Sequence, residues 1–508
     1  MAGAGRRQDG IDVTGRWLFA LALGVYALTA GGSLTTSDAV QSFDLTRNIV
    51  EARSMALSDS VAGADALRGR DGRFYSPFGI LPSLFHVPFY LGGKAAVALT
   101  GVRLGKPDTV PKAAVAMAQT LVVAIIVWQI FRLSTLITGA AAPSLLAALT
   151  FAFGSVLWPY ARFGFHQPLA CVTLVAAVDA AWLAVRRSEP TRFAWAALWL
   201  AAGLLTRHEL GLAIAPVAAW LWWSGRPSAA ERWQRLRAFV PVLAAGLAIW
   251  LALNAYRFGN PLDTGHLRDP VPGFGSPILD GLLGLLFSPA ASLFLYSPVA
   301  ALGLAGLFVL SRRDRATAAL LLSFIAMFVV FYATLGNWLG GRSYGSRYLL
   351  IVLPFLAVGW ASLLAALSSG VRLALGATVL AVSVVVQLPG VLVDYAKVSQ
   401  AATADRDGFS TAERQWSWEA APLVLNARAA AEAVPANIDY LLGRAPIPSI
   451  GGPAGAEDRG FSQQFAFSLD FWWLYLFYMG VLPRFGVFAV LVAGLAWTLL
   501  CLAKLRRV

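Results

Sequence analysis

A single carboxylate, Asp38, follows closely after the first long apolar run of the sequence. An unpaired carboxylate at the edge of a membrane is costly to hold, so such residues usually have a function. Asp38 could act as a general base that takes a proton from a hydroxyl group, and we expect partial desolvation to raise its pKa toward the useful range. The other interpretation is structural, because Ser37 or Asp38 could cap a helix that starts at Ala39.

Three arginines could supply positive charge to an anionic ligand such as a phosphate group. Arg347 stands at the start of an apolar run, where a helix N-terminus and a guanidinium would act together on an anion. Arg162 and Arg207 are the other two candidates. Each arginine could instead extend its side chain to lipid headgroups. That interpretation suits Arg342 better than Arg347, which lies among serine, tyrosine and glycine.

Further polar and aromatic side chains stand in the connectors between apolar runs, and we expect them to line a substrate cavity. These candidates are Asp44, Tyr75, His166, Gln167, Glu209, Asn260, His266, Tyr296 and Tyr344. Asp44 also competes with Asp38 for the catalytic role. Both cysteines, Cys171 and Cys501, lie inside apolar runs, which excludes a disulfide framework and a cysteine-based metal site. No cofactor is assigned, and a divalent metal is left open.

The elements that must position these residues are membrane-spanning helices. Apolar residues make up 58% of the 508 residues and charged residues 13%, against about 45–50% and about 25% in soluble domains. Apolar runs of roughly 17–22 residues, the length that crosses a bilayer, recur along the chain. They centre near 17–33, 112–131, 142–158, 168–185, 193–205, 209–223, 238–255, 292–310, 317–335, 347–366, 371–388 and 484–502. The sequence therefore predicts an all-α, polytopic transmembrane bundle of about 12 spans.

A thirteenth candidate span, within residues 76–99, is weaker because prolines, a histidine and a lysine interrupt it. If this segment does not cross, every dense basic cluster falls on the cytoplasmic side, as the positive-inside bias requires. We therefore expect it to be re-entrant or juxtamembrane, within a long first outer loop (35–110), and both termini to lie inside. The residues then expected inside are Arg226, Arg312 and Arg506, and those expected outside are Asp38, His266 and Arg347.

The spans divide the chain into three parts. Residues 1–390 form a transmembrane catalytic module, 391–483 an extracytoplasmic loop or small subdomain, and 484–508 the last helix with a cytoplasmic tail. The stretch 391–470 either lies on the catalytic face or is a partly disordered spacer. The net charge of +13 suits the cytoplasmic loops of a protein in the cell (inner) membrane. Nucleic acid is excluded as a partner because no basic segment is interleaved with exposed aromatic residues.

Several motifs together resemble the GT-C superfamily of polytopic glycosyltransferases, in particular its protein O-mannosyltransferase and aminoarabinose-transferase branch. The motifs are Asp38 in the first outer loop, the segment Tyr75-Ser76-Pro77, and the loop NAYRFGNPLDTGH at 254–266. The likeness runs from about residue 17 to 366. It implies that Asp38 is the catalytic carboxylate and that an outer cavity takes a polyprenyl-phosphate sugar. Gln167 stands where relatives carry an acid, which speaks against a two-carboxylate site and against a metal held through that residue.

One carboxylate is enough for the implied reaction, because a polyprenyl phosphate leaves as a stable anion and needs positive charge rather than a proton. We expect a single displacement, with inversion, onto a hydroxyl of a glycan, lipid or protein on the extracytoplasmic face. The alternative is a transporter or flippase of a lipid-linked saccharide. A flippase should carry ionisable residues through the middle of its spans, where this sequence is nearly bare of charge. A non-catalytic assembly subunit remains a third reading.

Overall fold

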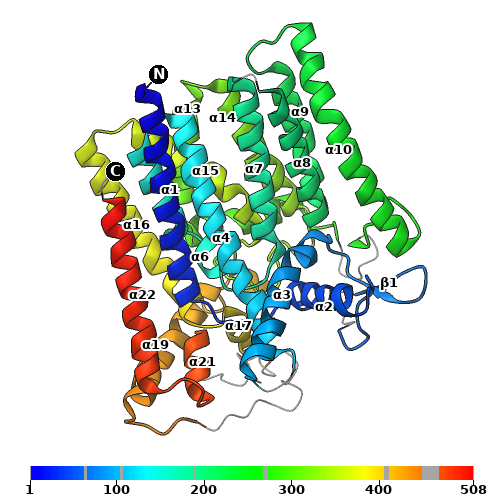
Figure 1. Ribbon diagram of the computed structural model, residues 1–508. Coiled ribbons are helices and arrows are strands. Elements are labelled where there is room, and N and C mark those ends of the chain that lie inside the picture. Colours follow the sequence, from blue (N-terminus) through cyan, green and yellow to red (C-terminus); the bar gives the residue numbers. More distant parts are fainter. Residues whose placement is uncertain are drawn as a thin grey trace.

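The computed structural model describes residues 2–61, 66–102, 104, 107–187, 189–266, 273–404, 411–448 and 468–506. The described chain is almost entirely helical, and its long helices run side by side in one bundle (Figure 1). Two short strands, β1 (Leu67–Arg68) and β2 (Phe74–Tyr75), pair antiparallel in the first outer loop. The predicted all-α class is therefore confirmed.

Each of the twelve apolar runs contains a long helix of the bundle. These helices are α1 (Ala2–Leu28), α4 (Thr109–Thr138), α5 (Ala141–Gly154), α7 (His166–Arg187), α8 (Pro190–Thr206), α9 (Ile214–Trp223), α10 (Ala229–Phe258), α13 (Val299–Ser311), α14 (Arg315–Ala333), α15 (Leu353–Ala365), α16 (Ser369–Leu392) and α22 (Arg484–Leu505). Seven of the described helices are long and apolar enough to cross a membrane. The count of about 12 spans stays a prediction.

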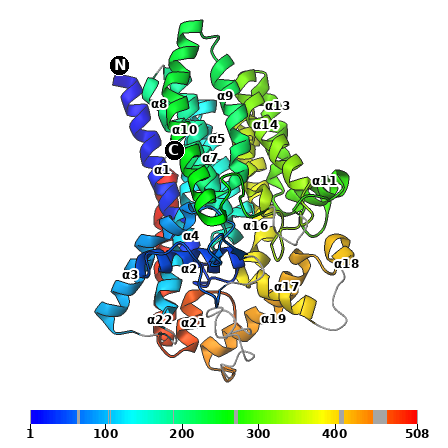
Figure 2. The same cartoon turned by 90° about the vertical axis from the view of Figure 1, so that its right-hand side faces the viewer.

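The remaining described helices join these, and several of them cover one end of the bundle. They are α2 (Ser37–Glu51), α3 (Leu81–Thr100), α6 (Leu157–Tyr160), η1 (His208–Ala213), α11 (Ile278–Phe287), α12 (Leu293–Tyr296), η3 (Tyr348–Val352), α17 (Tyr395–Ala404), α18 (Thr411–Trp416), α19 (Pro422–Leu442) and α21 (Trp472–Tyr478). Figure 2 shows α2 lying across the bundle axis, with α17, α19 and α21 at the same end. The described parts of 391–483 thus pack on the bundle as helices.

Residues 76–99, the weak thirteenth candidate, fold mainly as the continuous helix α3, with Pro88 inside it. The helix packs against α2 and α4. It is not among the described helices that meet the length and hydropathy needed to cross a membrane. How this segment lies in the membrane, re-entrant or juxtamembrane, stays a prediction.

Glycines bring α13 and α15 into close contact at the centre of the bundle. A Cβ atom on Gly306 would lie 1.8 Å from the carbonyl oxygen of Gly359, so a larger residue cannot fit. Small residues let membrane helices approach until their backbones touch. Helix α15 is buried along nearly its whole length as a result. It forms a rigid axis, and the segment that precedes it, including Arg347, is tied to the core.

The basic helix ends gather at one end of the bundle, away from α2. Arg186, at the end of α7, forms an ion pair with Asp314, just before α14. Both line an open groove with Arg226, which follows α9. At the C-terminus, the Lys504 ammonium lies 5.8 Å from the centre of the Trp17 ring. These connectors, which were expected inside, thus lie together, and the sidedness itself stays a prediction.

Candidate active site

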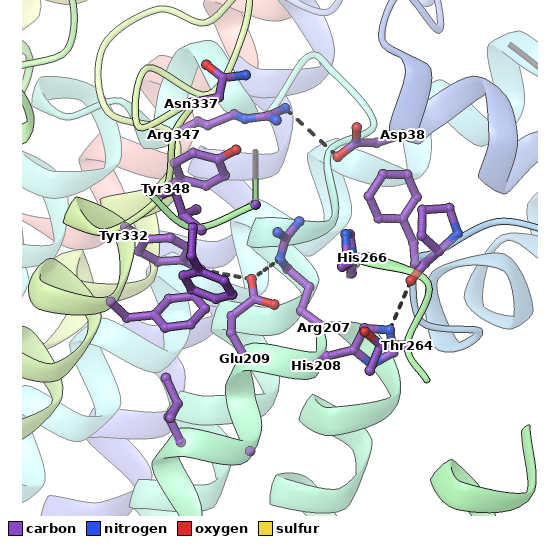
Figure 3. Close-up of a pocket in the computed structure, with 18 residues that line it drawn as sticks. Asp38, Arg207, His208, Glu209, Thr264, His266, Tyr332, Asn337, Arg347 and Tyr348 are labelled. Carbon is purple, nitrogen blue, oxygen red and sulfur yellow. Dashed lines mark hydrogen bonds and ion pairs between the residues drawn. The ribbon is translucent and has the colours of Figure 1, made fainter. Parts of the chain in front are cut away.

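A cavity of about 540 Å³ opens at the end of the bundle that α2 covers (Figure 3). Six segments supply its wall: the start of α2, the loop before α3, the α8–η1 junction, the loop after α10, the end of α14 and the entry to η3. Its charged and polar lining residues are Asp38, Arg207, His208, Glu209, Thr264, His266, Tyr332, Asn337, Arg347 and Tyr348. The ends of several helices and the loops beside them thus meet at one site.

Asp38 projects into this cavity from the first turn of α2. The N-cap of that helix is Thr36, whose side-chain oxygen accepts a hydrogen bond of 3.3 Å from the backbone N–H of Ala39. The cap is therefore Thr36, and the alternative in which Ser37 or Asp38 caps a helix that starts at Ala39 does not hold, because the helix begins at Ser37. Asp38 is 6% exposed, and its Oδ2 atom has no hydrogen-bond partner within the described residues. Capping does not account for this carboxylate.

The charge on Asp38 is held by neighbouring cations. Burial alone would raise the pKa of this carboxyl, but the positive charges of Arg347 and Arg207 help to outweigh burial, and the pKa lies below its ordinary value of 3.8. The expectation of a raised pKa was wrong because the sequence did not reveal how close Arg347 lies. Asp38 is therefore a carboxylate at neutral pH.

Arg347 faces Asp38 across the cavity, with 3.9 Å between its Nη1 atom and Oδ2 of Asp38 (Figure 3). Its guanidinium lies 4.8 Å from the centre of the Phe165 ring and 5.0 Å from that of Tyr348. Gly340 makes room for it: this residue has φ +73°, and a Cβ there would lie 2.8 Å from Nε of Arg347. Nε is buried and lacks a hydrogen-bond partner in the described chain. The two aromatic rings thus contact the cation, and its Nε–H stays unpaired among the described residues.

A second cation, Arg207, lies on the same cavity wall and forms a buried ion pair with Glu209. The hydroxyl group of Tyr332 donates a 2.9 Å hydrogen bond to the same carboxylate oxygen. The Tyr332 ring stacks on that of Tyr348, with centroids 4.8 Å apart. Among the described residues, Nη1 of Arg207 has no hydrogen-bond partner. Part of this guanidinium thus remains available to a ligand, although Glu209 offsets its charge.

The histidines form a group beside the cavity. His208 accepts a 2.7 Å hydrogen bond from the Trp250 indole at Nδ1, so its Nε2–H donates to the carbonyl oxygen of Pro77, 2.9 Å away. His266 lines the cavity, with its ring 5.7 Å from that of His208. His166 lies behind the wall, where its Nε2 atom is 2.6 Å from Oγ of Ser42. The pair of hydrogen bonds fixes His208 in one neutral tautomer.

Gln167, the residue that replaces an expected acid, is 1% exposed next to His166. Neither its amide nitrogen nor its amide oxygen has a hydrogen-bond partner among the described residues. It does not belong to the cavity wall that the described residues form. The structure therefore places it behind the site, as it does His166.

Arg162 is the clearest correction to the predicted phosphate site. Its guanidinium is fully buried in an ion pair with Asp470 and also donates to the carbonyl oxygens of Gly390 and Val393. It is not part of the described cavity wall. The sequence could not reveal this because its partner stands 308 residues further along the chain.

Five other candidates also lie outside the described cavity wall, and their side chains form hydrogen bonds or ion pairs elsewhere. They are Asp44, bound by Arg47 and Ser58; Tyr75, which donates to Asp71; Asn260, whose side-chain oxygen accepts from Leu262 N–H; Tyr296, which donates to the Pro289 carbonyl; and Tyr344, which donates to the Val386 carbonyl. Asp44 in particular organises the turn after α2. Each side chain supports the fold around the cavity.

Sequence reasoning missed several residues of the wall. Tyr348 and His208 are direct neighbours of predicted residues, and Asn337 stands in an outer connector, so their position gave a usable signal. Tyr332 lies inside an apolar run, where nothing distinguishes it from a tyrosine that faces lipid. No three His, Cys, Asp or Glu side chains come together as a metal site in the described part of the chain. The question of a metal stays open.

No protein-family profile and no curated protein sequence matches the chain. Among solved structures, it is similar to ArnT from Cupriavidus metallidurans in the apo state, with a TM-score of 0.51 and 14% identity, over 99% of this chain and 78% of that one. The chain has the fold of ArnT. The same ArnT bound to undecaprenyl phosphate matches with a TM-score of 0.51 and 14% identity, over 95% and 77% of the two chains. Because ArnT is an aminoarabinose transferase of the GT-C type, the predicted resemblance is confirmed at the level of the fold.

Proposed function

We propose that this protein is a glycosyltransferase that moves a sugar from a polyprenyl phosphate to an acceptor hydroxyl, with Asp38 as the general base. The observation that carries the proposal is the Asp38–Arg347 pair. A buried carboxylate oxygen without a hydrogen-bond partner among the described residues lies 3.9 Å from a partly exposed guanidinium in the wall of a ligand-sized cavity. A base and an anion-binding group thus stand next to each other in the wall of one cavity.

The proposed step is a single displacement at the anomeric carbon. Asp38 takes the proton of the acceptor hydroxyl, whose oxygen forms the new bond to that carbon as the bond to the phosphate oxygen breaks. The polyprenyl phosphate leaves with the electron pair, and Arg347 stabilises its charge, with Arg207 as the second cation. Attack from the side opposite the leaving group inverts the anomeric centre.

The lowered pKa of Asp38 suits a base that becomes active when the donor is bound. In the free enzyme Arg347 and Arg207 hold Asp38 in its charged, weakly basic form. A phosphate group bound to these arginines would offset their positive charge at Asp38. The pKa of the carboxyl would then rise, because burial is its largest single influence. Donor binding and base strength are coupled in this way.

The apolar part of the cavity fits a lipid donor. Leu212, Phe274, Phe331 and Leu335 line it beside the charged residues. An isoprenoid chain needs such a surface next to the site of its phosphate. The ArnT that shares this fold has been solved with undecaprenyl phosphate bound, and we propose the same class of donor here.

We propose that the cavity opens on the extracytoplasmic side of the cell membrane. The basic groove that contains Arg186 and Arg226 lies away from α2, at the other end of the bundle. The positive-inside bias assigns that end to the cytoplasm. Asp38, His266 and Arg347 then face outward, where lipid-linked sugars meet acceptors of the cell envelope.

The decisive experiment compares Asp38→Asn with Asp44→Asn in a transfer assay from a polyprenyl-phosphate sugar in liposomes. Asparagine keeps the size of the side chain but removes its charge and basicity. We expect Asp38→Asn to lower activity by about 10²–10⁴-fold at unchanged melting temperature. Asp44→Asn should retain activity per folded molecule, because Asp44 binds Arg47 and Ser58 instead of lining the cavity.

Two results would contradict the assignment. Loss of activity in the Asp44 variant with full activity in the Asp38 variant would transfer the catalytic role to Asp44. Full activity in both variants would exclude this loop as the catalytic one.

A further inference from the structure

A groove of about 1110 Å³ lies between α9 and α14, at the end of the bundle away from α2 (Figure 1). Each helix presents one face to it, because its lining residues stand at positions i, i+3, i+4 and i+7. They are Pro216, Ala219, Trp220 and Trp223 on α9, and Ala316, Ala319, Leu320 and Ser323 on α14. Proline, alanine and serine make up most of these faces, so the two helices leave space between them. We call this space the α9–α14 groove.

Positive charge gathers where α7 and α9 end and α14 begins. The charged lining residues are Arg186, Arg226, Arg313, Asp314 and Arg315. Arg186 and Asp314 form an ion pair, and Asp314 also accepts a 3.1 Å hydrogen bond from the backbone N–H of Thr317. The side chains of Arg226, Arg313 and Arg315 are exposed and have no hydrogen-bond or ion-pair partner within the described chain. Three positive charges thus remain to attract an anion.

Two tryptophans of α9 line the groove next to these arginines. Trp220 is 7% exposed, and its indole Nε1 atom is buried without a hydrogen-bond partner among the described residues. A buried N–H without an acceptor is costly, and a ligand oxygen can supply the missing acceptor. Trp223, one turn nearer the arginines, is 66% exposed. Tryptophan favours the level of the lipid headgroups, so this turn of α9 marks where an apolar environment gives way to a polar one.

We propose that the α9–α14 groove binds an anionic phospholipid of the surrounding membrane. Its phosphate group lies among Arg226, Arg313 and Arg315, and one acyl chain follows the small-residue faces of the two helices. Basic pockets between membrane helices recognise anionic headgroups in this way. The apolar faces favour a lipid over a free phosphate ion, which would leave them unused. This site is separate from the candidate active site, and the inference does not depend on the proposed function.

A lipid in this groove would join two helices that meet again at the candidate active site. Helix α9 follows η1, which carries Glu209, and the far end of α14 carries Tyr332. These two residues line the cavity and are hydrogen-bonded to each other. A ligand that binds only the folded protein stabilises it. We therefore expect an anionic phospholipid to raise the melting temperature of the protein.

The experiment measures lipid binding to the full-length protein in detergent by native mass spectrometry. Phosphatidylglycerol is compared with phosphatidylcholine of the same acyl chains, which carries no net charge. We expect phosphatidylglycerol to bind at least about tenfold more tightly, because three unpaired arginines face its phosphate. The combined variant Arg226→Gln, Arg313→Gln and Arg315→Gln should abolish this preference. Because all three side chains are exposed, the variant should fold, and its melting temperature without added lipid checks this.

Matched variants separate the groove from the general charge and bulk of the surface. Arg312→Gln removes an exposed neighbouring charge that does not line the groove, and it should keep the preference for phosphatidylglycerol. Ala319→Phe fills the groove from α14 without changing its charge and should weaken phosphatidylglycerol several-fold. Ala326→Phe adds the same bulk to an exposed position of α14 outside the described groove and should have no effect. The Ala319 variant also tests the site if the combined arginine variant does not fold.

Three further results would overturn the inference. Equal binding of phosphatidylglycerol and phosphatidylcholine to the wild-type protein, or an equal loss in the Arg312 variant, would refute a specific site in the groove. Displacement of phosphatidylglycerol by glycerol 1-phosphate at the same concentration would assign the groove to soluble phosphates. Binding of undecaprenyl phosphate that is lost in the combined arginine variant, with phosphatidylglycerol unaffected, would assign it to a polyprenyl lipid.

Discussion

Two arginine–aspartate pairs stand at the end of the bundle that α2 covers, and their contacts differ. Arg162 and Asp470 are in close contact, and the arginine also donates to backbone carbonyl groups, while Tyr475 donates to the aspartate. Arg347 and Asp38 are 3.9 Å apart, and each retains a polar atom without a hydrogen-bond partner among the described residues.

The difference shows what each pair is for. A buried ion pair is tolerated when further hydrogen bonds satisfy both partners, and it then fixes the segments that carry them. The Arg162 pair does this for the segment that leads into α21. The Arg347 pair leaves bonding capacity unused at a cavity, which is costly in a folded protein unless a ligand completes it. A structural ion pair thus has all its polar atoms hydrogen-bonded, whereas a candidate catalytic pair leaves some of them without a partner.

The largest expected effect is on stability, and it follows from breaking the Arg162–Asp470 pair. Arg162→Ala would leave the Asp470 carboxylate buried without its cation, and we expect it to lower the free energy of unfolding by about 3–5 kcal/mol. Thermal melting followed by loss of monodisperse protein in detergent measures this. Replacing both partners, with Arg162→Met and Asp470→Leu, should recover much of the loss because no charge is left unpaired. Unchanged melting of Arg162→Ala would refute the structural role.

A smaller effect, on activity, is expected from a change in the Arg347–Asp38 pair. Arg347→Ala should lower kcat/KM at least about tenfold, or about 1.4 kcal/mol of transition-state stabilisation, because the leaving phosphate loses its nearest cation. Melting should change far less than in the Arg162 variant. The measurement is the initial rate of sugar transfer at several donor concentrations. Wild-type kinetics in this variant would move the phosphate site to Arg207.

The smallest effect is a shift in pH dependence. Asp38 works as a base only when charged, and its lowered pKa keeps it charged down to below its ordinary value of 3.8. Arg347→Gln removes the main lowering influence and leaves burial, so the pKa of Asp38 should rise. The acid limb of the residual kcat/KM profile then moves to higher pH. An acid limb at the same pH in both proteins would show that the two residues are not coupled.

Sequence reasoning located the charged residues of the cavity because they stand where apolar runs end. Asp38, Arg207, Glu209, His266 and Arg347 all occupy such positions and all line the cavity. The helical bundle followed from hydropathy, since run length alone fixes which segments can span a bilayer.

The sequence could not show which of these charged groups already have hydrogen-bond or ion-pair partners in the folded protein. Asp44 resembles Asp38 in sequence, but Arg47 and Ser58 engage it. The partner of Arg162 is distant along the chain, and Tyr332 is one aromatic residue within an apolar run. Whether a polar group has a partner depends on three-dimensional contacts, so the local sequence pattern does not reveal it.

The contact between Arg162 and Asp470 also sets an order of events during synthesis. The two residues are separated by 308 positions, which a ribosome covers in roughly 15–60 s at about 5–20 residues per second. Throughout that interval the nascent chain carries Arg162 into the outer end of the bundle without its counter-ion. The Arg162–Asp470 contact therefore forms only after the segment before α21 has been made, and a chain released before residue 470 cannot form it.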